Sequence, residues 1–144
     1  MYKIILTPLI AAMAAQLCKF FIKSNRLKFN WRSLMSYAGM PSSHAAMTVS
    51  LCAIVGLAED WSSPLFAISL VFTILVIRDA MGLRRYIGQH GEMINDLVKD
   101  LRRDNIELAQ KYPRLIEKIG HTPAQIIAGG AIGLAISLIS YYFI

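Results

Sequence analysis

The chain has 144 residues, of which 56% are hydrophobic and 17% are charged, and its mean hydropathy is +0.48. Soluble domains carry about 25% charged residues, so this composition argues against a soluble protein and predicts a single membrane domain over residues 1–144. The net charge of +6 does not indicate nucleic acid binding, because no recognition helix or basic-aromatic platform accompanies it. We therefore expect no nucleic acid partner.

Four apolar segments predict an all-α fold, an integral membrane helical bundle with about four transmembrane helices. The spans are expected near residues 3–22, 42–58, 64–81 and 122–144. The second and third are short against the roughly 20 residues that cross a bilayer, so we expect tilted or polar ends. The fourth contains Gly129-x-x-x-Gly133, which permits close helix packing and would suit a possible homodimer.

The two cysteines, Cys18 and Cys52, lie in apolar runs and are expected to be packing residues. A charged insertion at 84–119 separates the third and fourth spans. Its apolar residues recur at roughly helical spacing, which predicts one or two amphipathic helices, broken near Pro113, on or beside the cytoplasmic face of the membrane.

The distribution of basic residues predicts the topology. Residues 23–40 hold four Lys or Arg and residues 78–120 hold nine, which together make thirteen of the fifteen in the chain. The positive-inside rule places both connections in the cytoplasm and both chain ends outside. We expect an integral protein of the bacterial inner (plasma) membrane whose functional site faces the cytoplasm.

Three polar motifs fall on the predicted cytoplasmic side. The first is Gly39-Met40-Pro41-Ser42-Ser43-His44, in which Gly39 allows an unusual backbone angle, Pro41 pre-sets a first helical turn and the serines cap it. The second runs from Arg78-Asp79 to Arg84-Arg85, and the third is Gly120-His121-Thr122-Pro123-Ala124-Gln125. Each motif alone is more often a capped helix or an interfacial anchor.

Together the three motifs indicate a phosphoryl-transfer site. Helix N-termini attract phosphate, a histidine can pass a proton near neutral pH, and arginines offer forked donors to phosphate oxygens. With these motifs in this order, the chain resembles the divergent branch of the phosphatidic acid phosphatase and vanadium haloperoxidase superfamily. The matching stretches are Gly-Met-Pro-Ser-Ser-His, Asp-Ala-x-Gly-x-Arg-Arg-x-x-Gly and Gly-His-Thr-Pro-x-Gln.

The resemblance implies a metal-independent membrane phosphatase without a cofactor. Its partners would be the membrane lipid and a phosphorylated lipid substrate, hydrolysed at a phosphate or diphosphate through a phosphohistidine. In this interpretation His44 protonates the leaving alcohol, while Ser42, Ser43 and backbone N–H groups bind phosphate. Lys19 has the spacing of the family's early phosphate-binding motif, although Leu27 stands where a proline is expected. Arg32 is a second candidate for that role.

The resemblance leaves two candidates for the nucleophile. His121 opens a membrane helix as His44 does and is preferred, with Arg84 or Arg85 as the phosphate-binding arginine. His90 follows Arg84 at the family's spacing but would lie on an amphipathic surface helix.

Neither candidate nucleophile has the expected aspartate. Gln125 replaces it after His121, and Ile94 replaces it after His90. Asp79 could substitute for the missing carboxylate, or it could pair with Arg84 or Arg85. The departures at Gln125 and Leu27 keep open a protein that binds or transports a lipid phosphate without hydrolysing it. A membrane scaffold whose histidines only cap helices is the third hypothesis.

Overall fold

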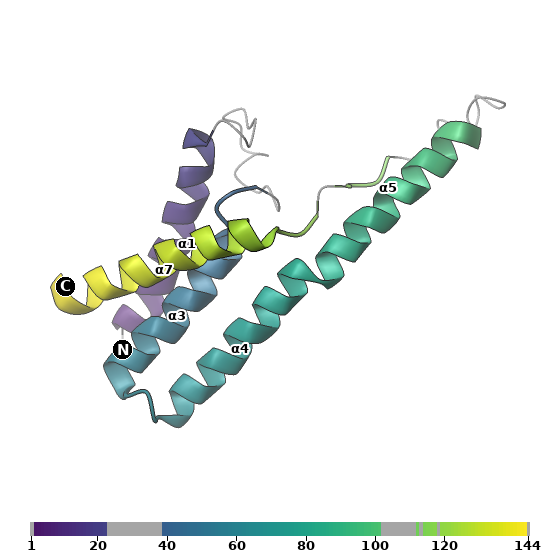
Figure 1. The fold of residues 1–144 in the computed structure, drawn as a ribbon. Helices are drawn as coiled ribbons and strands as arrows, with labels where there is room; N and C mark the ends of the chain where they lie inside the picture. Colours follow the sequence, from purple (N-terminus) through teal and green to yellow (C-terminus); the bar gives the residue numbers. More distant parts are fainter. Residues whose placement is uncertain (1, 23–38, 102–111, 113, 118, 144) are drawn as a thin grey trace.

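The fold is seen in a computed structural model, which describes residues 2–22, 39–101, 112, 114–117 and 119–143. These residues form helices and connections and contain no strand. The helices are α1 (Tyr2–Phe21), α3 (Ser43–Glu59), α4 (Pro64–Met81), α5 (Leu83–Leu101) and α7 (Pro123–Phe143), shown in Figure 1. The predicted all-α membrane bundle is confirmed.

Helix α3 is the centre of the bundle. It packs against α1, α4 and α7, and its own 17 residues make it the shortest of the five described helices. The continuous stretch of α4 and α5, together with α1 and α7, is long and apolar enough to cross a membrane, whereas α3 is a shorter apolar helix. The predicted four-helix bundle therefore consists of three candidate spans around one short buried helix.

Small and hydroxyl-bearing residues form the inner contacts, and large apolar residues point outward. One buried cluster contains Ala11, Ala15 and Ala46, while Ile68 of α4 is 66% exposed. Hydroxyl groups pair across the bundle, with Ser50 Oγ 2.8 Å from Ser137 Oγ. Close packing of small residues with hydrogen bonds between helices is the pattern of membrane bundles, where lipid covers the apolar exterior.

Helices α3 and α7 approach most closely at two glycines. A Cβ atom on Gly129 would overlap the Ser42 carbonyl oxygen, and one on Gly133 would overlap that of Ala46. The predicted Gly-x-x-x-Gly packing face is therefore used within one chain. The possible homodimer stays a prediction, and this glycine face no longer supports it.

Helix α5 continues almost in line with α4 after a break at Gly82 (Figure 1). The chain then returns along α5, where the side chain of Asn95 accepts from the Leu115 N–H and donates to its carbonyl oxygen, both at 2.9 Å. Gly88 and Gly91 leave room for that returning backbone. The predicted amphipathic helix is thus found at α5, whereas residues 114–117 are not helical and the backbone groups of Leu115 hydrogen-bond to Asn95.

Candidate functional site

Four helix ends and the loop before α7 bring together a group that we call the histidine cluster: Lys19, His44, Asp79, Arg84 and His121. The rings of His44 and His121 have centroids 6.1 Å apart and meet edge to face. His44 interacts electrostatically with Arg84, Lys19 and Asp79, and His121 with Lys19, His44 and Arg84. These five residues, which are far apart in the sequence, therefore share one electrostatic environment.

The Pro-Ser-Ser-His turn places His44 in the first turn of α3. Ser42 is the N-cap, and its Oγ accepts from the Ala45 N–H at 3.3 Å while its own N–H donates to the Gln125 carbonyl oxygen at 2.9 Å. Gly39 has the predicted positive φ, at 112°. The helix begins at Ser43 and not at 41 or 42 as expected, because the extended backbone of Ser42 makes it the cap.

Ser42 is fully buried and its hydroxyl is engaged in this cap. Its contribution is thus to build the turn. The N–H groups of Ser43 and His44 occupy the first positions of α3, where the helix itself offers no acceptor. Those two N–H groups, with the Ser43 hydroxyl, are the donors that this turn can offer to an anion.

His121 is held in place by the loop before α7. Gly120 has φ 93°, and a Cβ there would lie 2.9 Å from the backbone nitrogen of Arg85. The close approach of this loop to α5 therefore requires glycine. The His121 N–H donates to the Ala80 carbonyl oxygen at 3.0 Å. This bond fixes the loop against the end of α4, which brings the imidazole next to the α4–α5 junction.

The His121 imidazole is buried without a hydrogen bond. The residue is only 5% exposed, and neither Nδ1 nor Nε2 has a partner among the described residues. Burial, followed by the charges of Lys19, His44 and Arg84, lowers the pKa of His121 to about 4. The ring is therefore neutral at pH 7 and retains a nitrogen lone pair for an incoming group.

The two candidate partners of His121 are engaged elsewhere. The Gln125 side chain accepts from the Thr122 N–H at 3.0 Å, and Thr122 Oγ1 accepts from the Gln125 N–H at 3.4 Å. This reciprocal pair is a capping box, which the Thr-x-x-Gln spacing could have predicted. Asp79 Oδ2 accepts from Arg84 Nε at 2.6 Å, so of the two alternatives for Asp79 the structure shows the ion pair.

The structure separates the remaining candidates. Arg84 joins the histidine cluster, whereas Arg85 is exposed on α5. His90 is also exposed, and the electrostatic interactions resolved for His44 and His121 do not include it. Lys19 is 1% exposed and lies among the cluster residues. Arg32, Leu27 and the rest of the first basic connection lie outside the described residues.

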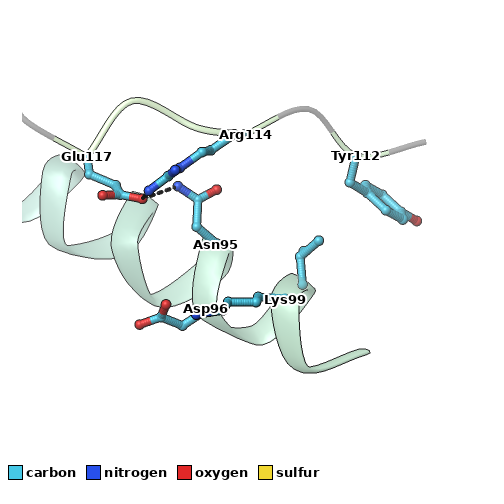
Figure 2. Close-up of a pocket in the computed structure, with 7 residues that line it drawn as sticks. Asn95, Asp96, Lys99, Tyr112, Arg114 and Glu117 are labelled. Carbon is cyan, nitrogen blue, oxygen red and sulfur yellow. Dashed lines mark hydrogen bonds and ion pairs between the residues drawn. The ribbon is translucent and has the colours of Figure 1, made fainter. Parts of the chain in front are cut away.

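A separate cavity of about 220 Å³ lies between α5 and the returning chain (Figure 2). Its wall includes Asn95 and Glu117, which hydrogen-bond to each other at 2.9 Å. No residue of the histidine cluster lines it. Over the part of the chain that the structure describes, no three His, Cys, Asp or Glu side chains could hold a metal ion together.

Comparison with known proteins identifies relatives along nearly the whole chain. A family model described as the Divergent PAP2 family matches residues 2–136. The "Uncharacterized membrane protein YuiD" of Bacillus subtilis (strain 168) is 35% identical over 151 aligned residues, which cover 96% of this chain and 94% of that protein. No solved structure matches.

Proposed function

The chain belongs to the Divergent PAP2 family, and on that premise we propose that it is a membrane phosphatase. Its substrate would be a lipid phosphate or diphosphate, bound at the histidine cluster and hydrolysed through a phosphohistidine. The lipid tail would lie among the helices, with the site at the cytoplasmic face of a bacterial inner membrane. The single observation that carries the proposal is the close approach of the buried His121 imidazole to the ring of His44.

The proposed reaction has two steps. A His121 nitrogen attacks phosphorus and forms an N–P bond as the P–O bond to the lipid alcohol breaks, while protonated His44 gives its proton to the leaving oxygen. Water then attacks the phosphohistidine, His44 accepts a proton from that water, and the N–P bond breaks to release phosphate. The two rings are close enough to serve opposite faces of one phosphoryl group, since their centroids are 6.1 Å apart.

The charges around His121 suit a phosphate ligand. Lys19 and Arg84 both act on this imidazole, and the N-terminus of α3 adds a partial positive charge beside His44. Positive groups fixed in a buried site stabilise the negative charge on phosphoryl oxygens and cost no reorganisation during the reaction. Burial, together with these charges, keeps His121 neutral before substrate binds, which a nucleophilic imidazole requires.

A second candidate function is binding or transport of a lipid phosphate without hydrolysis. The observation that favours it is the absence, among the described residues, of a hydrogen bond that orients His121. Gln125 caps α7, and the Asp79 carboxylate binds Arg84. A nucleophilic histidine usually has an acceptor that fixes its ring and tautomer, so its loss would lower turnover more than binding.

The experiment is phosphate release by the purified chain from phosphatidic acid, phosphatidylglycerophosphate or a polyprenyl diphosphate, with chelator present. We expect activity that vanadate inhibits and that His44→Ala and His121→Ala abolish, with His90→Ala as the matched control that retains it. A phosphorylated peptide trapped with substrate should carry the phosphate on His121.

Three results would contradict parts of this proposal. Loss of activity only in His90→Ala would move the nucleophile to α5. Tight binding of the phosphorylated lipid without release would favour the second candidate function. Unchanged binding and activity in a variant lacking both His44 and His121 would leave the histidines as helix caps in a scaffold.

A further inference from the structure

Helix α5 carries an apolar stripe with the spacing of a coiled coil. We define the α5 seam as the residues that recur at alternating intervals of four and three: Leu83, Ile87, His90, Ile94, Leu97 and Leu101. An interval of 3.5 residues keeps a stripe facing one partner helix. The five apolar residues of the seam are between 46% and 67% exposed.

The order of residue types in the seam favours two parallel helices. With Ile87, Ile94 and Leu101 at the a positions, Leu83, His90 and Leu97 take the d positions. Branched isoleucine at a with leucine at d is the combination that favours two-stranded parallel coils. His90 is the polar residue of the seam and takes an interior d position.

The direction of α5 relative to α4 suits a pairing with a second copy of the chain. Helix α4 has 18 residues, about 27 Å, and the hydrocarbon core of a bilayer is about 30 Å thick. Because α5 continues almost in line with α4 (Figure 1), an α4 that crosses the bilayer projects α5 out of it. Two copies in one membrane share one orientation, so their projecting α5 helices are parallel, as the seam requires.

The described residues of the returning chain leave the seam open. It packs on the neighbouring face of α5, over Gly88 and Gly91, and its Ile116 is 68% exposed beside that face. Full burial of a large apolar side chain contributes about 1.5–3 kcal/mol, which at 25 cal/mol per Å² corresponds to roughly 60–120 Å² for each side chain. The five apolar residues of the seam, together with Tyr86 and Met93 beside it, make seven exposed side chains on α5. Their burial in two copies would remove on the order of 1,000 Å² from water, which is the size at which specific interfaces begin.

We propose that the α5 seam is the interface of a parallel homodimer, with α5 paired outside the membrane. The charged side chains of α5, including Glu92, Asp96 and Lys99, fall outside the seam and stay in water. The inference does not depend on the chemistry of the histidine cluster. It gives the charged connection between α4 and α7 a role in assembly.

The test is cysteine cross-linking of the full chain in membranes. In a background with Cys18→Ala and Cys52→Ala, Leu97→Cys should form a disulfide-linked dimer on mild oxidation, because paired d positions meet the Cα separation below about 7 Å that a disulfide needs. Gln89→Cys, on the opposite polar face, is the matched control and should stay monomeric. Equal cross-linking at both positions, or none at Leu97, overturns the proposal.

A second measurement tests whether the seam is covered by something other than a second copy of the chain. The mass of the purified protein, with detergent subtracted, should be that of a dimer and should halve in the double variant Ile94→Asp and Leu97→Asp, but not in Gln89→Asp. A dimer that survives the double variant places the interface elsewhere. A Leu97→Cys thiol that forms no dimer and is shielded from a water-soluble maleimide would place α5 on the bilayer and refute the proposal.

Discussion

The protonation of His121 offers the sharpest test of the site. Burial and the charges of Lys19, His44 and Arg84 lower its pKa from 6.5 to about 4. At about 1.36 kcal/mol per pH unit, this difference corresponds to roughly 3 kcal/mol in favour of the neutral ring. At pH 7 the neutral form should therefore exceed the protonated form by roughly a thousandfold, against roughly threefold for a histidine with the ordinary value.

The same shift makes folding stability depend on pH. Between pH 4 and 6.5 the unfolded chain holds a proton on His121 that the folded chain does not hold. The contribution of His121 to the free energy of unfolding is therefore complete above pH 6.5 and is lost as the pH falls toward 4. The loss from this residue should reach roughly 3 kcal/mol below pH 4.

The assay is a histidine-selective NMR titration of the protein in lipid nanodiscs. The chain has three histidines, so His44→Ala and His90→Ala assign the signals. One signal should report an imidazole that remains neutral down to about pH 5. Lys19→Gln should raise the pKa of that histidine because the substitution removes a nearby positive charge. Lys3→Gln, at the far end of α1, is the control. A His121 signal that titrates near 6.5 in the unaltered chain would refute the reasoning.

Three further predictions follow from the packing and the ion pair. Gly129→Ala should lower the thermal midpoint in detergent and the free energy of unfolding by about 1–3 kcal/mol, because the added Cβ would overlap the Ser42 carbonyl. Gly130→Ala is the control and should be nearly neutral, because its Cβ would lie 3.5 Å from the Val49 side chain. Asn95→Ala should speed hydrogen exchange at the Leu115 amide, and equal protection in both proteins would contradict the observed bond. Asp79→Asn should change the free energy of unfolding by less than about 1 kcal/mol, since both side chains of the Asp79–Arg84 ion pair are more than a third exposed. The same substitution should slow phosphate release, because it removes the negative charge that favours protonated His44.

The sequence was sufficient to predict the helical fold because the pattern of apolar runs and basic connections acts over whole segments. It also predicted the Gly39 turn and the close packing at Gly129, since only glycine suits those backbones. Partner choices among polar groups were different. Asp79 had two acceptable arginines within six residues, and only the geometry of the Gly82 break brings Arg84 to it.

The role of Gln125 shows why motif matching stops short of a mechanism. The position aligns with an aspartate that orients a histidine in the wider superfamily, but Thr122 stands three residues earlier and completes a capping box. A local bond that closes over three residues is formed at little entropic cost, so it competes well against a bond to His121. The choice between these partners depends on distances that no spacing rule contains.

The two histidines differ in ways that assign opposite tasks to them within the proposed reaction. His121 is almost fully buried and responds to Lys19, His44 and Arg84, which all disfavour its protonated form. His44 is half-buried, and burial, Arg84 and Lys19 lower its pKa, while the negative charge of Asp79 partly opposes them by favouring the protonated form. Paired titratable groups in contrasting environments are how one site supplies a base and an acid at the same pH. A phosphate between them would add negative charge and favour protonation of both rings. The more exposed His44, with its own carboxylate neighbour, is then the ring that can exchange its proton with water and with the leaving oxygen, and this leaves the buried His121 to attack phosphorus.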